Sequence, residues 1–118
     1  MDISEFDILI TKIEASAKIE KEKIIQDVEN LREEWLSITE EISYLEDVRD
    51  DLDDQVQLTY LDLDQVNDSN PSYKSVKEQF EKAKKEYDDW NGHNRLEDLT
   101  QKLNKIEKKY NSLKTNFK

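Results

Sequence analysis

Apolar side chains recur every three or four residues along the N-terminal half of the chain. This spacing places them along one side of a helix, as in the seam of a coiled coil. The stripe slips by four residues at Ile24, and we interpret the slip as a stutter, which unwinds a supercoil locally without ending the helix. Neither glycine nor proline occurs between Met1 and Ser69. The pattern therefore predicts one long acidic coiled-coil helix. Its predicted self-association seam consists of Ile10, Ile13, Ile24, Val28, Leu31, Trp35, Ile38, Ile42 and Leu45.

The weakest part of this helix is an aspartate-rich run, in which Asp50–Asp54 contains four aspartates and one leucine. Aspartate has a low helix propensity, and neighbouring like charges repel one another. We therefore expect either a kink or a helix end between Asp47 and Gln55.

The C-terminal part of the chain has two further helical stripes. Asn70 followed by Pro71 is typical of a helix start. The first stripe stops at Asn91-Gly92, where a glycine in the left-handed conformation can close a helix. A short connection between two helices favours an antiparallel hairpin. The predicted fold is thus all-α, a single helical domain over residues 1–118 with a long helix over 1–66, a loop over 67–70 and hairpin arms over 71–90 and 94–117.

Composition agrees with a helical protein and excludes several other classes. One glycine and one proline in 118 residues are too few for the turns of a sandwich or barrel, or for a phosphate-binding loop. Charged residues make up 40% of the chain, as in many disordered proteins, but the regular stripes favour a folded one. The chain has no cysteine, so it can form neither disulfides nor thiolate metal sites.

The sequence predicts neither a membrane span nor a secretion signal. The longest apolar run is Ile8–Ile10, whereas a membrane span needs roughly 18 residues. Acidic residues lie near the start of the chain at Asp2, Glu5 and Asp7, whereas the first region of a signal peptide is basic. We therefore expect a cytoplasmic protein that does not associate with membranes.

The predicted lengths favour self-association. A helix over residues 1–66 would be about 90 Å long, whereas each hairpin arm would be roughly 30 to 35 Å, so the hairpin could not cover the long stripe. Either a second chain covers the remainder or the long helix folds back near the aspartate run. We expect a homo-oligomer, with a dimer favoured. Trp35 is bulky for a parallel two-stranded coil, which favours antiparallel or higher-order packing.

Charge is divided unevenly along the chain, whose net charge is -11. Residues 1–68 carry 21 acidic and 6 basic side chains, whereas residues 69–118 carry 8 acidic and 12 basic side chains. The lysine-rich hairpin can therefore pack on the acidic helix of its own chain or of a partner chain. With this net charge we expect no direct binding of nucleic acid.

A second interpretation concerns Glu40–Asp68, which holds 11 acidic residues and one basic residue, Arg49. A rod with this density of carboxylates could imitate a nucleic-acid backbone, whose charge dominates the affinity of proteins that bind it. Tyr44 lies off the apolar seam, and an exposed aromatic side chain there would indicate a partner surface. The candidate partner-binding residues of this acidic face are Glu46, Asp47, Asp50, Asp51, Asp53 and Asp54.

Residues that could carry out catalysis or bind a metal are scarce. His93 is the only histidine, which excludes a di-iron carboxylate site built on two Glu-x-x-His motifs. The segment Asp62-Leu63-Asp64 resembles the start of a calcium loop but lacks the required glycine and distal glutamate. We therefore predict a non-enzymatic protein without a metal or cofactor.

The turn Trp90-Asn91-Gly92 resembles the Trp-x-Gly turn of the WXG family, the small helical-hairpin proteins of type VII secretion systems and their partners. The resemblance covers residues 72–118 and implies a four-helix dimer that functions in secretion. It departs from the family in the long preceding helix and in the lack of a Tyr-x-x-x-Asp/Glu signal after Tyr110. That spacing occurs upstream, from Tyr60 to Asp64.

These observations favour a coiled-coil interaction or assembly protein that self-associates through its N-terminal helix. One alternative is an acidic helical inhibitor of a nucleic-acid-binding enzyme, of the kind that mobile elements use. Another alternative is a helical partner protein associated with type VII secretion.

Overall fold

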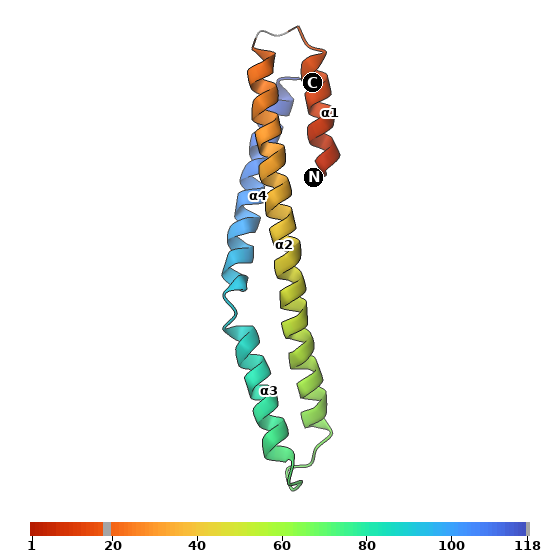
Figure 1. Cartoon of the computed structure of the whole chain (residues 1–118), viewed down its shortest axis with the longest axis vertical. Coiled ribbons are helices and arrows are strands. Elements are labelled where there is room, and N and C mark those ends of the chain that lie inside the picture. Colours follow the sequence, from red (N-terminus) through yellow and green to blue (C-terminus); the bar gives the residue numbers. More distant parts are fainter. Residues whose placement is uncertain (18–19, 118) are drawn as a thin grey trace. The chain divides into compact units, whose positions relative to one another are not determined.

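The computed structural model describes residues 1–17 and 20–117. All regular secondary structure in these residues is helical, and the chain contains a long helix followed by two shorter ones (Figure 1). The predicted all-α fold is therefore confirmed. The helices are α1 (Ile3–Glu14), α2 (Lys21–Asp64), α3 (Tyr73–Asp88) and α4 (Gly92–Thr115).

The contacts within the chain group into two compact units. Unit 1 comprises Met1–Ile42 and Glu97–Lys118, and unit 2 comprises Ser43–Leu96. Helix α2 contributes its first half to unit 1 and its second half to unit 2. Most of α4 belongs to unit 1, whereas α3 belongs to unit 2.

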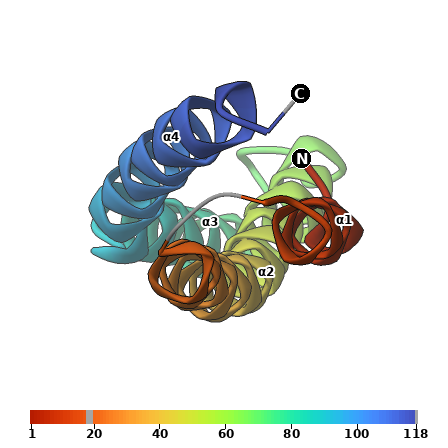
Figure 2. The same ribbon diagram turned by 90° about the horizontal axis from the view of Figure 1, so that it is seen from above.

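Unit 1 is built from three helical segments that share one apolar core. Figure 2 shows α1, the beginning of α2 and the end of α4 at three corners of this unit. The Phe6 ring lies at its centre, 5.9 Å from the Trp35 ring and 5.3 Å from the Tyr110 ring between centroids. The buried residues of this core are Phe6, Leu9, Ile13, Val28, Leu31, Ile106, Tyr110 and Phe117.

A break between α1 and α2 corrects the prediction of one continuous helix from residue 1. Helix α1 ends at Glu14 and α2 begins at Lys21, so the slip in the apolar stripe marks a chain reversal and not a stutter. Glu20, just before α2, has a φ of 64°, which lies in the left-handed region that non-glycine residues seldom adopt. The reversal is stabilised because it lets the apolar side of α1 pack on α2 and α4 within one chain.

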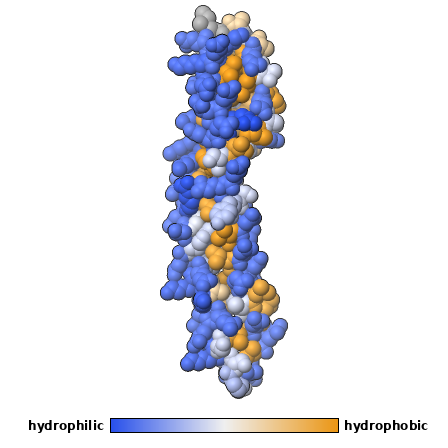
Figure 3. Space-filling view, viewed as in Figure 1, coloured by the Kyte–Doolittle hydropathy of each residue, from blue (hydrophilic) through white to orange (hydrophobic). Residues whose placement is uncertain are grey.

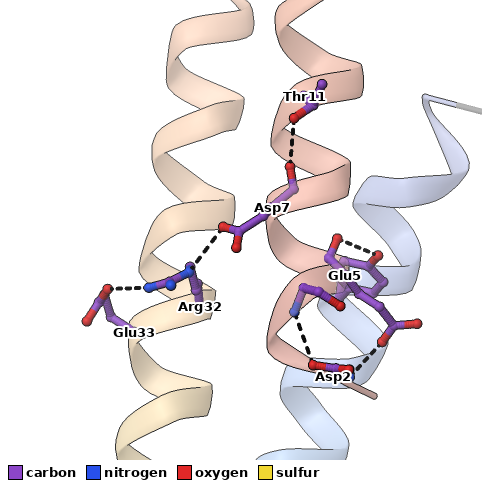
Figure 4. A network of polar contacts seen from close by, with 8 residues as sticks. Asp2, Glu5, Asp7, Thr11, Arg32 and Glu33 are labelled. Atoms are coloured by element: carbon purple, nitrogen blue, oxygen red, sulfur yellow. Dashed lines mark hydrogen bonds and ion pairs between the residues drawn. The ribbon is translucent and has the colours of Figure 1, made fainter.

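Polar contacts hold α1 in place at its start and along its length (Figure 4). Asp2 caps α1: its side chain accepts a hydrogen bond from the Ser4 amide, and the Asp2 amide donates to the Glu5 side chain. The Arg32 Nε of α2 lies 3.3 Å from Asp7 Oδ1 of α1. The cap stabilises the first turn of α1, whereas the ion pair links α1 to α2.

Helix α2 continues through the aspartate run to Asp64, so the helix end expected between Asp47 and Gln55 is absent. The aspartates of the run are exposed, whereas Leu52 within it is half-buried. Packing of the inward stripe, which includes Leu45 and Val56, outweighs the low helix propensity of aspartate, because tertiary contacts routinely override propensity.

In unit 2, the second half of α2 packs on α3. Figure 1 shows the two segments running in opposite directions, joined at one end by a loop. The centroids of the Tyr60 and Phe80 rings lie 5.9 Å apart. The short turn after α3 leads into α4, as the sequence predicts. The predicted starts were residues 71 and 94, whereas α3 begins at Tyr73 and α4 begins at Gly92. Each C-terminal helix therefore packs on α2 within its own unit.

Together, the two C-terminal helices nearly match α2 in length. Helices α3 and α4 have 16 and 24 residues, nearly as many together as the 44 residues of α2. The first half of α2 is covered by α1 and α4 in unit 1, and the second half by α3 in unit 2. The apolar stripe of α2 therefore finds its cover within one chain.

Candidate functional site

The acidic face predicted from the sequence lies in unit 2, on the side of α2 that points away from α3. All six of its residues are exposed, and each belongs to an unbroken stretch of helix. Because a helix fixes the direction of each Cα–Cβ bond, the carboxylates are held in a constant pattern and do not scatter as they would in a loop. The members of this acidic face are Glu46, Asp47, Asp50, Asp51, Asp53 and Asp54.

One of these carboxylates has an ion-pair partner among the residues that the structure describes. Asp50 Oδ1 lies 3.7 Å from Arg49 Nε. The other five residues make no ion pair within 4.0 Å with any residue in the part of the chain that the structure describes. The acidic face is therefore a concentrated negative charge that the protein itself leaves largely uncompensated.

Large apolar side chains are exposed beside the acidic face. Tyr44 is 68% exposed, Leu58 56% and Leu61 52%. Figure 3 shows hydrophobic atoms at the surface near the end of α2 that leads into the loop. Single exposed apolar residues are ordinary, but a group of them beside uncompensated charge is typical of an interaction surface.

Helical geometry places these apolar residues on the same side of α2 as several of the aspartates. The separations from Tyr44 through Asp47, Asp51, Asp54 and Leu58 alternate between three and four residues, as for side chains on one side of a helix. The sequence predicts an exposed Tyr44 but not the two exposed leucines. Their position off the inward apolar stripe is the signal that could have identified them.

The predicted self-association seam lies mainly inside unit 1. Ile13 and Val28 are fully buried there, and Leu31 is 7% exposed. Ile10, Ile24, Trp35 and Ile38 are partly buried and pack against the same core. Ile42 ends the unit 1 segment of α2, and Leu45 lies half-buried in unit 2. The seam is thus used within the chain.

The turn between α3 and α4 is built around Trp90. A Cβ atom at Gly92 would overlap the Trp90 indole at Cζ2, Cε2 and Cη2. The sequence predicts a left-handed conformation for Gly92, but its φ is not positive. The glycine is therefore required for the close approach of the ring and not for a left-handed turn. His93 Nε2 lies 2.7 Å from the Tyr87 carbonyl oxygen; because a carbonyl only accepts, this nitrogen carries a proton.

The aromatic rings around this turn give His93 a structural role. Its imidazole stands edge-on to the Tyr87 ring at 4.9 Å and to the Trp90 ring at 5.0 Å between centroids. Such edge-to-face pairs add to packing. The described residues contain no group of three or more histidine, cysteine, aspartate or glutamate side chains that could hold a metal ion.

Unit 1 has a shallow groove between α2 and α4, with a volume of about 430 Å³. Leu31 and Leu113 form its apolar part. Lys109 and Ser112 line it from α4, and Asp27 and Glu34 from α2. The lining of this groove therefore combines an apolar part with charged side chains of both signs.

Comparison of the chain with protein-family models, with curated proteins and with solved structures gave no match. Among the helices of the described residues, none is both long and apolar enough to cross a bilayer.

Proposed function

We propose that this protein is a non-enzymatic helical interaction protein that binds a protein partner on the acidic face of α2. The observation that carries the proposal is the coincidence, on one side of a rigid helix, of exposed carboxylates with exposed Leu58 and Leu61. The carboxylates give long-range attraction to a basic partner. The leucines provide apolar area that becomes buried only on binding.

The location of the proposed surface differs from the seam predicted from the sequence. Ile13, Val28 and Leu31 already fill the core of unit 1. A second chain would have to displace α1 or α4 to reach them, and that exchange would expose as much apolar surface as it buried. Binding through the outward side of α2 requires no such exchange.

Affinity capture with paired baits tests the proposal. The bait with Asp47→Asn, Asp50→Asn, Asp51→Asn, Asp53→Asn and Asp54→Asn should lose the protein that the wild-type bait retains. A bait with Leu58→Ser and Leu61→Ser should lose it as well, because the apolar contact is then absent. Circular dichroism of both variants checks that the helices are intact.

The control bait carries Asp62→Asn, Asp64→Asn and Asp68→Asn, three exposed acids outside the acidic face. It should retain the partner. The proposal fails if all baits retain the same proteins, since retention would then not depend on this surface.

A second candidate function is an acidic inhibitor of a nucleic-acid-binding enzyme. The five carboxylates of the acidic face without an ion pair favour it, since they could occupy a groove that is lined for phosphates. This function predicts that the captured protein binds nucleic acid and that added DNA or RNA displaces it from the bait. Capture of a partner that nucleic acid cannot displace would exclude this candidate.

The resemblance to the WXG family stays a prediction. The close approach of the Trp90 ring explains the glycine at residue 92 without any family relationship. A role in type VII secretion would be supported by capture of a component of that system on the same baits.

A further inference from the structure

Two rows of side chains on different helices of this chain have the same spacing and opposite charge. Both follow separations of three, four and four residues, and each ends in a leucine. The row on α2 in unit 2 is Asp47, Asp50, Asp54 and Leu58. The row on α4 in unit 1 is Lys102, Lys105, Lys109 and Leu113.

These separations keep each row on one side of its helix. Each residue advances a helix by about 1.5 Å along its axis. If two such helices lie side by side in the same direction, equal separations in sequence therefore correspond to equal distances along both helices. Every aspartate of the first row can then face a lysine of the second, and Leu58 comes level with Leu113. The match therefore extends over about 16 Å of helix.

The charged members of both rows are available for such a contact. The three lysines and three aspartates are exposed. Within the residues that the structure describes, none of the three lysines makes an ion pair, and among the aspartates only Asp50 has one, to Arg49. Within the described residues, the charges of the two rows are thus left without ion pairs, apart from that of Asp50.

The groove of unit 1 provides a place for the leucine at the end of the α2 row. Lys109 and Ser112 line this groove, and its apolar part is formed by Leu31 and Leu113. Leu58 is 56% exposed and lies four residues beyond Asp54. A contact that places Asp54 against Lys109 brings Leu58 to the mouth of the groove.

We propose that a second copy of this chain is the first partner of the acidic face. Its α4 lysine row docks in parallel on the α2 aspartate row, and Leu58 of one copy enters the groove of the other. The proposal rests on the proposed function, because it names the partner of the same surface. It needs only surfaces that lie wholly within unit 1 of one copy and unit 2 of the other.

Charge reversal provides the test, with mass measured by light scattering after size-exclusion chromatography over a series of concentrations. One variant carries D47K, D50K and D54K, and the other carries K102E, K105E and K109E. The wild-type chain should exceed the monomer mass of 14.1 kDa as its concentration rises. Each variant alone should associate at least about tenfold more weakly, because attraction at three positions becomes repulsion.

The mixture of the two variants is the decisive sample. Its reversed rows are again complementary, so association should return to the wild-type level in particles that contain both variants. Two charge-matched controls change exposed residues outside the rows and should associate as the wild type does. One control carries D62K, D64K and D68K, and the other carries K74E, K77E and K84E.

Several results would overturn the proposal. If the wild-type mass stays at 14.1 kDa at every concentration, the chain does not bind a second copy. The proposed function would still hold in that case if baits altered on the acidic face lose another protein that the wild-type bait retains. Association that both variants retain places the contact elsewhere. A mixture that stays monomeric while the wild type associates excludes this pairing of rows, and circular dichroism of each variant shows whether unfolding is the cause.

Discussion

The indole of Trp90 lies so close to the Cα of Gly92 that a Cβ at residue 92 would overlap three atoms of the ring. The turn between α3 and α4 therefore depends on the absence of a side chain and not on an unusual backbone angle, since the φ of Gly92 is not positive. His93 completes the arrangement by donating from Nε2 to the Tyr87 carbonyl oxygen.

Gly92→Ala should destabilise the protein by about 1–3 kcal/mol, because an added methyl group in a filled space forces neighbouring side chains to move. Thermal or urea unfolding measures the effect. In a Trp90→Ala background the same substitution should have little effect, since the ring that it would strike is gone. Equal losses in both backgrounds would show that the ring is not the cause.

Phe6→Ala should destabilise the protein by about 3–5 kcal/mol, because Phe6 is fully buried between α2 and α4. Ile8→Ala on the same helix is the matched control. Ile8 is 54% exposed, so its loss should change stability by less than about 1 kcal/mol. If both substitutions are mild in urea unfolding, α1 is not part of the core.

Tyr110 should make stability depend on pH in the alkaline range. Burial, and then the neighbouring charge of Glu5, raise the pKa of Tyr110 above its usual value of 10.0. The folded state thus holds this proton more tightly than the unfolded state does, so the contribution is present in full below pH 10 and is lost as pH rises through the folded pKa. Urea unfolding at several alkaline pH values measures the decline.

Tyr110→Phe should remove that part of the decline. It should also lower stability near neutral pH by about 0.5–1.5 kcal/mol, because the Tyr110 hydroxyl donates to the Glu5 carbonyl oxygen at 3.1 Å. Tyr44→Phe removes a hydroxyl at a residue that is 68% exposed, so it should change stability near neutral pH by less than about 0.5 kcal/mol. A wild-type profile in the Tyr110→Phe variant would contradict the assignment.

Glu20→Asn should stabilise the protein by about 1 kcal/mol. Asparagine tolerates the left-handed conformation that Glu20 adopts at φ 64° better than other non-glycine residues do. Glu20→Ala keeps the strain and should give no such gain. The two variants are compared by thermal unfolding, and an equal response of both would indicate that backbone strain at residue 20 is negligible.

The sequence predicts the helices well, and it predicts their partners poorly. Regular spacing of apolar residues was sufficient to identify a long helix, two C-terminal helices and the short turn at Trp90. The break between α1 and α2 was not predictable, since neither glycine nor proline marks it, and the phase slip at Ile24 fits either a stutter or a break. The helix through Asp50–Asp54 was underestimated because local propensity does not include tertiary packing, and Leu52 within this run is half-buried.

The candidate site was predicted in part. Charge counting located the acidic face, because exposed charge is a property of the sequence itself. The contribution of Leu58 and Leu61 was missed, since their exposure depends on which side of α2 packs on α3. The seam residues were identified correctly as apolar and inward, but sequence spacing does not distinguish a partner chain from the chain's own helices.

The inward side of α2 completes the chain's own core, whereas its outward side is the surface that we propose for a partner. The chain has no cysteine, so single cysteines at residues 28 and 58 can be labelled separately. In dilute solution, the thiol of Leu58→Cys should react with a maleimide nearly as fast as in an unfolded peptide, whereas that of Val28→Cys should react at least about a hundredfold more slowly, because it is exposed only on opening of the core. A fast reaction at residue 28, with protection at residue 58, would contradict the account.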